Sequence, residues 1–290
     1  MILGFIGLGI MGESMAHNLI KKSGLTVYVY DIEKDKVEQL EKHGARAASN
    51  SQEVVQHADI IFTSVPKAEH VKVIHESIYE HISKGQIFVD MSTIAPKDSI
   101  VLADKLREYG AEFLDAPVVK SKQAAIDGTL GIYVGGDKET YQKVKPYLEM
   151  IGSSVVYMGT NGKGLIMKIC HNMLVGEIQN GVNEMLLLAQ KNGIDWRLFK
   201  EAISIGGGKN FYLETKAQAI GTQDYTTAFS IENMFKDVTI AKELIAQHGL
   251  ELPGATLVQN IYQEAIAENL GSKDFAATYE VVAKKHVSET

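Results

Sequence analysis

Lys168, His171 and Asn172 are the side chains of this sequence whose types and spacing best suit proton-transfer chemistry. On a helix, residues three and four positions apart project from the same face, so the three would lie together. The lysine could donate a proton to a carbonyl oxygen as the carbonyl is reduced, or accept one from a hydroxyl in the reverse direction. Asn172 could orient the lysine and hold a substrate oxygen. The spacing alone leaves a solvated surface lysine as the alternative.

The start of the same helix favours this chemistry. Its positive dipole end disfavours a charged ammonium, and its unpaired amides favour a substrate anion. Around His171 no second histidine, cysteine or carboxylate stands at a metal-ligand spacing, so we expect a polar neighbour of the site and no metal. Cys170 points to another face of the helix, where we expect it to fill the core.

A second candidate is the stretch 115–122, which reads as a strand end followed by a loop with two lysines and a serine. In an open α/β sheet, ligands bind beyond the carboxyl ends of the strands, so this loop is placed to hold a substrate anion. We expect Lys120 and Ser121 to make the contacts, through charge and a hydrogen bond, beside Val119. A pair of solvated lysines is the alternative.

The third candidate is a dinucleotide site at the N-terminus, where a short apolar run leads into Gly7-Leu8-Gly9-Ile10-Met11-Gly12. Gly7 permits a tight turn, Gly9 lets a pyrophosphate approach the backbone, and Gly12 lets helix and strand pack closely. A second β-rich run ends at Asp31, whose carboxylate would accept hydrogen bonds from a ribose and repel a 2′-phosphate. The cofactor predicted is therefore NAD; the alternative is that Asp31 only caps a turn.

Further strand ends extend this cofactor site. One strand stops at Val65 and Pro66, and another ends in Asp90-Met91-Ser92-Thr93, whose hydroxyls suit the nicotinamide ribose or carboxamide. The spacing of Lys236-Asp237 has no interpretation by itself.

The elements that must position these residues alternate between strands and helices in the first half of the chain. Strands are expected at 2–6, 25–30, 60–65, 86–90, 112–115, 131–134 and 154–157, and helices at 11–22, 69–82 and 97–109. From 164 to 192 there is no proline and the apolar spacing is helical, which predicts a helix roughly 40 Å long. Helices then follow at 196–205, 230–248, 255–269 and 275–285, with Gly206-Gly207-Gly208 as a loop.

This pattern predicts an α/β fold: an N-terminal Rossmann domain with a doubly wound, mainly parallel sheet, a long interdomain helix and an all-α C-terminal domain. We place the domains at residues 1–162 and 163–290. A net charge of −7 without long basic runs argues against nucleic acid and anionic membranes as partners. One cysteine, no signal-like N-terminus and no long apolar run predict a cytoplasmic protein.

Several separated motifs, in order along nearly the whole chain, make it resemble the β-hydroxyacid dehydrogenase family. The motifs are residues 4–12 with 15–16 and 18–19, then 90–93, 115–118, 128–130, 162–168 with Asn172, and 236–237. The resemblance implies that Lys168 is the catalytic acid/base, that Asn172 binds substrate, and that Thr93 and Lys236 contact the cofactor. It also implies homodimers or homotetramers and an NAD-dependent oxidoreductase acting on a short anionic hydroxyacid or its semialdehyde. A non-catalytic NAD-binding sensor is the alternative of another class.

The sequence departs from the family pattern where the substrate would bind. The common Ser-Gly-Gly after Asp-Ala-Pro-Val is replaced by Val119-Lys120-Ser121, and His171-Asn172 stands where many relatives have paired asparagines. The loop looks similar to that of the 3-sulfolactaldehyde reductase branch, in which an arginine and hydroxyls grip a sulfonate. The substrate predicted is 3-sulfolactaldehyde, reduced to 2,3-dihydroxypropane-1-sulfonate, ahead of 3-hydroxyisobutyrate, tartronate semialdehyde or a dicarboxylate semialdehyde.

Overall fold

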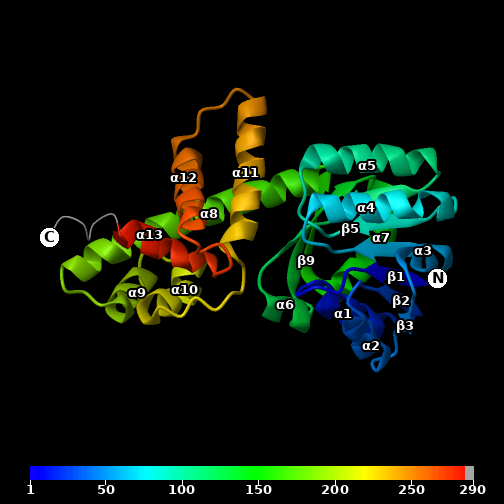
Figure 1. The fold of residues 1–290 in the computed structure, drawn as a ribbon, viewed down its shortest axis with the longest axis horizontal. Coiled ribbons are helices and arrows are strands. Elements are labelled where there is room, and N and C mark those ends of the chain that lie inside the picture. The colour runs from blue at the N-terminus through cyan, green and yellow to red at the C-terminus, as the bar shows by residue number, and fades with distance from the viewer. Residues whose placement is uncertain (285–290) are drawn as a thin grey trace. The chain divides into compact units, whose positions relative to one another are not determined.

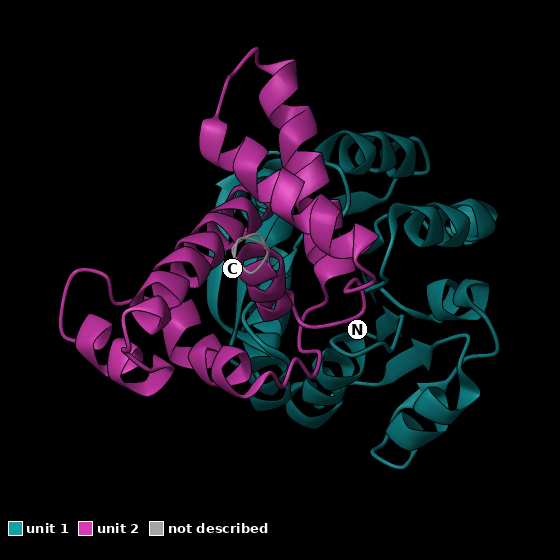
Figure 2. Cartoon of the chain, turned by 60° about the vertical axis from the view of Figure 1, so that its left-hand side comes forward, with its two compact units in different colours: residues 1–168 teal, residues 169–290 magenta. Residues whose placement is uncertain are grey.

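A computed structural model describes residues 1–284 and divides the chain into two compact units. The first unit is Met1–Lys168 and the second begins at Ile169; Figure 2 colours them teal and magenta. The boundary that we predict at residues 162 and 163 stays a prediction. Lys285, the last residue of the final predicted helix, lies outside the described residues.

The first unit is built on one sheet whose strands follow the order β3-β2-β1-β4-β5-β6-β8-β7, with β9 beside β8. β8 runs antiparallel to β6 and β7, and every other pairing is parallel. The order of the first six strands is that of a doubly wound dinucleotide-binding sheet, which confirms the predicted fold class. The strands are β1 (Leu3–Ile6), β2 (Val27–Tyr30), β3 (Arg46–Ala47), β4 (Ile60–Thr63), β5 (Ile87–Asp90), β6 (Glu112–Asp115), β7 (Val118–Val119), β8 (Leu130–Gly136) and β9 (Gly152–Gly159).

Helices cover both faces of this sheet because alternate strand residues point to opposite sides. Leu3 and Phe5 of β1 belong to one hydrophobic cluster together with helices α1 and α7, whereas Ile6 belongs to another with α3, α4 and α5. Figure 1 shows these helices around the sheet. The helices are α1 (Gly12–Ser23), α2 (Lys34–Glu41), α3 (Ser51–His57), α4 (Ala68–Ile78), α5 (Pro96–Glu108), α6 (Lys122–Asp127) and α7 (Lys138–Ile151), with the 3₁₀ turn η1 (Tyr79–His81) after α4.

The second unit is helical throughout its described part, as predicted; two of its residues, Ser230 and Asp274, form an isolated bridge. The long helix α8 (Lys163–Lys191) enters it from the first unit and is green in Figure 1. Its other helices are α9 (Trp196–Ser204), α10 (Phe211–Thr222), α11 (Ile231–Gln247), α12 (Pro253–Ala267) and α13 (Thr278–Lys284), with the 3₁₀ turn η2 (Phe275–Ala277) before α13.

Two local predictions need correction. Cys170 is exposed and does not fill the core, because α8 buries its neighbour Ile169 and the next side chain lies about 100° around the helix. The structure also contains helices that the sequence pattern does not predict. One is α7, in which Pro146 interrupts an otherwise helical pattern, and the others are α2, α3, α6 and α10.

Between residues 1 and 284, no helix combines the length and the apolar character needed to cross a membrane.

Candidate active site

The glycine-rich loop between β1 and α1 has the geometry of a dinucleotide site. Gly7 has a φ of +93°, and a Cβ atom there would lie 2.3 Å from the carbonyl oxygen of Ser64. A Cβ on Gly12 would lie 2.0 Å from the carbonyl oxygen of Gly7, so helix and strand approach as closely as predicted. A Cβ on Gly9 would meet no protein atom within 4 Å, so this glycine faces open space where a pyrophosphate can approach the backbone. Met11, the N-cap of α1, offers no side-chain hydrogen bond to the helix, which leaves its first turn to an anion.

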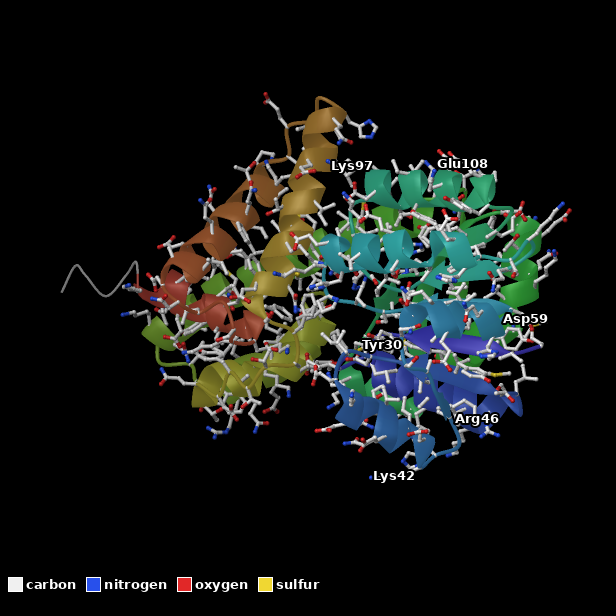
Figure 3. The ribbon with its side chains drawn as sticks, turned by 45° about the vertical axis from the view of Figure 1, so that its right-hand side comes forward. Tyr30, Lys42, Arg46, Asp59, Lys97 and Glu108 are labelled. Atoms are coloured by element: carbon white, nitrogen blue, oxygen red, sulfur yellow. The ribbon has the colours of Figure 1, made fainter. Side chains whose placement is uncertain are left out.

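Asp31 follows β2, one residue after Tyr30, which Figure 3 labels. Its Oδ2 accepts a hydrogen bond of 2.6 Å from the Leu8 amide, and its Oδ1 accepts one of 2.8 Å from the Glu33 amide. The carboxylate therefore ties the glycine-rich loop to β2 and also caps the turn that follows. Because a carboxylate oxygen accepts two hydrogen bonds, each oxygen keeps a lone pair for a ribose hydroxyl.

The lysines that follow Asp31 stand among acidic residues, with Lys34 between Glu33 and Asp35. Lys36 is bonded to Glu33 at 2.6 Å, and this hydrogen bond raises the pKa of the lysine. Two apolar side chains are exposed nearby in the chain: Ile32, directly after Asp31, is 85% exposed, and Ile10, within the glycine-rich loop, is 64% exposed. The sequence reading did not single out Ile32; its signal is an apolar residue directly after the acid that ends a strand.

Hydrogen bonds fix the strand ends of β4 and β5. Thr63 donates its hydroxyl to Asp90 Oδ1 at 2.8 Å, and Ser92 Oγ accepts from the Val65 amide at 3.0 Å. Pro66 is exposed and Thr93 half-exposed just beyond these bonds. The predicted cofactor residues of these two strands are thus held at the same edge of the sheet.

The loop after β6 is held by its own contacts. Lys120 has a φ of +88°, in the left-handed region that favours glycine, and its Nζ donates to the Thr129 carbonyl at 2.6 Å. Ser121 is the N-cap of α6, with its Oγ accepting from the Ala124 amide at 3.3 Å. Val119 is buried in β7 against Gly131. The assignment of these three residues to the substrate stays a prediction, since the side chains of Lys120 and Ser121 bond to protein atoms and Val119 is buried.

The strand end of β6 reveals a residue to which the sequence reading gave no role in chemistry. The Asp115 carboxylate is 1% exposed and accepts hydrogen bonds from the amides of Gly162 at 2.7 Å and Leu165 at 3.0 Å. Burial raises the pKa of Asp115, and these two backbone hydrogen bonds oppose that shift. Because Gly162 and Leu165 lie 47 and 50 residues along the chain, no spacing signal could have paired them with this acid.

α8 is a continuous helix over Lys168, His171 and Asn172, as predicted. Asn172 is buried, and its Nδ2 donates to Asp237 Oδ2 of α11 at 2.5 Å. Asp237 is buried as well, and its Oδ1 lies 3.3 Å from Lys236 Nζ. The structure therefore joins Asn172 and the Lys236-Asp237 pair, which the sequence left uninterpreted, in one hydrogen-bonded and charged cluster.

Two family models together cover nearly the whole chain. Residues 2–159 match the NAD-binding domain of 6-phosphogluconate dehydrogenase, and residues 162–282 match the NAD-binding domain of NADP-dependent 3-hydroxyisobutyrate dehydrogenase. This chain belongs to the β-hydroxyacid dehydrogenases. It is an oxidoreductase that acts on a CH–OH group with a nicotinamide cofactor, and not a non-catalytic sensor.

Individual relatives of this β-hydroxyacid dehydrogenase are similar to it over nearly its full length. It is 33% identical to 2-(hydroxymethyl)glutarate dehydrogenase of Eubacterium barkeri, over 96% of this chain and 94% of the relative. It is 31% identical to the NAD-dependent L-serine dehydrogenase of Pseudomonas aeruginosa, over 94% of this chain and 95% of the relative. Among solved structures, 3-hydroxyisobutyrate dehydrogenase of Mycobacterium tuberculosis with L-serine has a TM-score of 0.89 and 27% identity, over 97% of this chain and 98% of that one.

The glycine-rich loop and Asp31 of this β-hydroxyacid dehydrogenase have the geometry that binding of a nicotinamide dinucleotide requires. The open approach to Gly9, the first turn of α1 without a side-chain cap and the remaining lone pairs of Asp31 are the parts such a molecule needs. The residues that would hold it are those of the glycine-rich loop together with Asp31.

Proposed function

We propose that this β-hydroxyacid dehydrogenase moves a hydride between NAD(H) and the aldehyde or primary hydroxyl of a short anionic hydroxyacid, with Lys168 as the acid/base. The observation that carries this proposal is the fixed amide of Asn172, four residues from Lys168 on one helix and hydrogen-bonded to the buried Asp237. An immobilised amide beside a lysine is a prepared environment for a substrate oxygen and for the proton that moves to or from it.

The chain's own residues handle the proton and the orientation of substrate. When bound, a nicotinamide cofactor supplies or accepts the hydride at the substrate carbon. During reduction, the Lys168 ammonium donates a proton to the carbonyl oxygen; during oxidation, neutral Lys168 accepts the proton of the hydroxyl. Asn172 uses one N–H on Asp237 and keeps a second N–H and its Oδ1 for the substrate oxygen and the lysine. Thr93 and Lys236 are assigned to the cofactor, as Val65 and Pro66 are.

NAD is the proposed cofactor in preference to NADP. A carboxylate at Asp31 accepts hydrogen bonds from ribose hydroxyls and repels a phosphate in the same place, while Lys36 is already paired with Glu33. The check is a comparison of kcat/KM with NADH and NADPH. A higher kcat/KM with NADPH would contradict the assignment.

3-Sulfolactaldehyde is the proposed substrate, and its product is 2,3-dihydroxypropane-1-sulfonate. The support is the loop Val119-Lys120-Ser121, which adds a cation and a hydroxyl where the family pattern has small residues. The Lys120 side chain is exposed and bonded to a carbonyl near the surface, so rotation about its flexible stem can bring the ammonium to a sulfonate. His171 completes the proposed substrate site. The competing substrates are 3-hydroxyisobutyrate, tartronate semialdehyde and a dicarboxylate semialdehyde; a relative named for 2-(hydroxymethyl)glutarate keeps the last in the comparison.

The test is a panel of sulfonate and carboxylate aldehydes assayed with purified protein and NADH. Sulfolactaldehyde should give the highest kcat/KM, and an equal or higher value for a carboxylate semialdehyde would exclude the sulfonate assignment. In the same assay, Lys168→Ala should abolish turnover and leave NADH affinity nearly unchanged. Turnover retained by Lys168→Ala would refute its acid/base role.

We also propose that the protein is a homodimer or homotetramer in the cytoplasm, with the domain boundary at residues 162 and 163. The support for self-association lies on α8, where apolar side chains recur every three or four residues and remain accessible. Leu174, Met185 and Leu188 are at least half exposed, and Ile178 and Gly181 continue the same stripe. A stripe with this spacing on a long helix suits packing against a helix of a second copy.

A further inference from the structure

We propose that Asp115 is a positioning residue, whose buried carboxylate fixes the first turn of α8 and thereby the place of Lys168. This inference rests on the proposed acid/base role of Lys168. Asp115 ends β6 and never needs to touch substrate; it would act only through the helix that carries the lysine.

The carboxylate holds the helix start with both of its oxygens. Oδ1 accepts the Gly162 amide at 2.7 Å and Oδ2 accepts the Leu165 amide at 3.0 Å. Amides at a helix start have no partner within the helix, so a charged acceptor from a neighbouring strand satisfies two of them at once. Strand β6 therefore holds the start of α8 through two hydrogen bonds, which fix both the position and the rotation of the helix.

Glycines on β8 and α8 make room for the Asp115 carboxylate. A Cβ on Gly135 of β8 would lie 2.7 Å from Asp115 Oδ1. A Cβ on Gly164 of α8 would lie 2.8 Å from Oδ2 and 2.5 Å from the carbonyl oxygen of Tyr133. Glycine is the least favourable ordinary residue after proline within a helix, so its presence at Gly164 is explained by the close approach of β6 and β8.

Accepting both amides requires a carboxylate at residue 115. Burial and the neighbouring Asp90 raise the pKa of Asp115, and the Gly162 and Leu165 amides counter this by stabilising the charged form. An asparagine of the same shape has one accepting atom, and its NH₂ group would face the second amide with donor against donor. Asp115→Asn therefore changes few atoms but removes one of the two hydrogen bonds to the start of α8.

A small displacement here reaches Lys168 directly. Leu165 precedes Lys168 by three residues, which is less than one helical turn. The later part of α8 is anchored separately, with Ile169, Met173 and Leu186 in the core of the second unit. The helix therefore persists without Asp115, and what the carboxylate adds is the placement of the first turn.

The first experiment measures Asp115→Asn in the full-length protein with NADH and its best aldehyde substrate. The expected result is a kcat about 10- to 100-fold lower, as for a misplacement of about 1 Å, with NADH affinity and KM for NADH within about twofold of wild type. The isotope effect on kcat with 4-deuterated NADH should rise, because the chemical step becomes slower than product release. A folded Asp115→Asn protein with wild-type kcat and isotope effect overturns the inference.

Asp274→Asn is the matched control. Asp274 is 2% exposed and accepts the amides of Ala228, Phe229 and Ala276, so it is also a buried carboxylate that binds backbone N–H groups. These partners, and Lys216 with which it forms an ion pair, all belong to the second unit. This variant should lose thermal stability and keep kcat per folded molecule. An equal loss of kcat in both variants would mean that Asp115 acts only through general stability.

Gly164→Ala tests the same two hydrogen bonds from the helix side, and it replaces Asp115→Asn if that variant does not fold. The added methyl group would displace Asp115 Oδ2 and the Tyr133 carbonyl, while the aspartate itself is retained. The same fall in kcat with unchanged NADH affinity is expected, and a wild-type kcat refutes the role of these hydrogen bonds. Lys168→Ala separates the two proposals: turnover in that variant refutes the role of Lys168, whereas an inactive Lys168→Ala with a fully active Asp115→Asn refutes only the role of Asp115.

Discussion

His75 makes the first unit sensitive to mild acid. Its side chain on α4 is 1% exposed, and neither ring nitrogen has a hydrogen-bond partner among residues 1–284. The ring packs instead against aromatic rings, with centroids 5.9 Å from Phe88, 6.2 Å from Phe113 and 6.3 Å from Tyr79. A protonated imidazole in this place would be a buried charge without a partner.

The size of the effect follows from the pKa. Burial lowers the pKa of His75 from 6.5 to about 4 in the folded protein, while the unfolded chain keeps the ordinary value. At pH 7.5 and above, the ring is almost entirely neutral in both states. Between pH 6.5 and 4 the unfolded chain binds a proton that the folded protein does not, so the free energy of unfolding falls as the pH falls. At 1.36 kcal/mol per pKa unit, about 2 kcal/mol is lost by pH 5 and about 3 kcal/mol by pH 4.

The assay is urea unfolding of wild type and His75→Leu at pH 7.5 and pH 5.0, followed by far-UV circular dichroism. Fluorescence is unsuitable, because the single tryptophan, Trp196, lies in the second unit. At pH 7.5 the variant should be as stable as wild type or more so, since two unpaired ring nitrogens are removed. At pH 5.0 the difference in its favour should grow by about 2 kcal/mol.

The control for this experiment is His70→Leu, which replaces an exposed histidine of the same helix. Its stability relative to wild type should be the same at both pH values. Comparing each variant with wild type removes the contribution of every other titrating group. If the advantage of His75→Leu is equal at pH 7.5 and 5.0, the reasoning about burial of a neutral ring is wrong.

Three further predictions concern the cofactor loop, the substrate loop and α8. Gly12→Ala should weaken NADH binding at least about tenfold in a fluorescence titration, because its Cβ would lie 2.0 Å from the Gly7 carbonyl; unchanged affinity would refute the predicted close packing. Lys120→Gly should raise KM for the anionic substrate and change the free energy of unfolding by less than about 1 kcal/mol, because relief of a φ of +88° is offset by the lost hydrogen bond to Thr129 and by a freer unfolded chain; unchanged KM would remove Lys120 from the substrate site. Met185→Asp should shift the protein towards monomers in sedimentation velocity, and an unchanged assembly would exclude the α8 stripe as an interface.

The sequence was sufficient for the architecture because its strongest signals are local. Apolar runs that end in glycine, proline or acids mark β1, β2, β4 and β5, and the proline-free pattern marks α8 within one residue at each end. α7 was missed because Pro146 breaks the pattern on which helix prediction depends, although the rest of this helix packs into the sheet's core through Val144 and Leu148. Tertiary packing outweighs the local penalty of proline there, and no single segment shows that in advance.

The same distinction divides the candidate site. Lys168 and Asn172 can be grouped from sequence because four residues on a helix fix their common face. The acids that hold this arrangement, Asp115 and Asp237, are bonded to partners 47 to 65 residues away. Their roles depend on which strand or helix lies beside α8, which is a property of the complete fold.

The backbone conformation at Lys120 is set by the segments on either side of it. The pairing of Val118 and Val119 with β8 fixes the loop on one side, and the Ser121 cap of α6 fixes it on the other. Between these points the backbone must take a positive φ, and the lysine adopts it at a cost of about 1 kcal/mol. Glycine would meet the backbone requirement at lower cost but would lose the hydrogen bond from Lys120 Nζ to the Thr129 carbonyl, so a lysine in this conformation points to a use for its ammonium. The use that we propose is the binding of an anionic substrate, and the rise in KM expected for Lys120→Gly tests it.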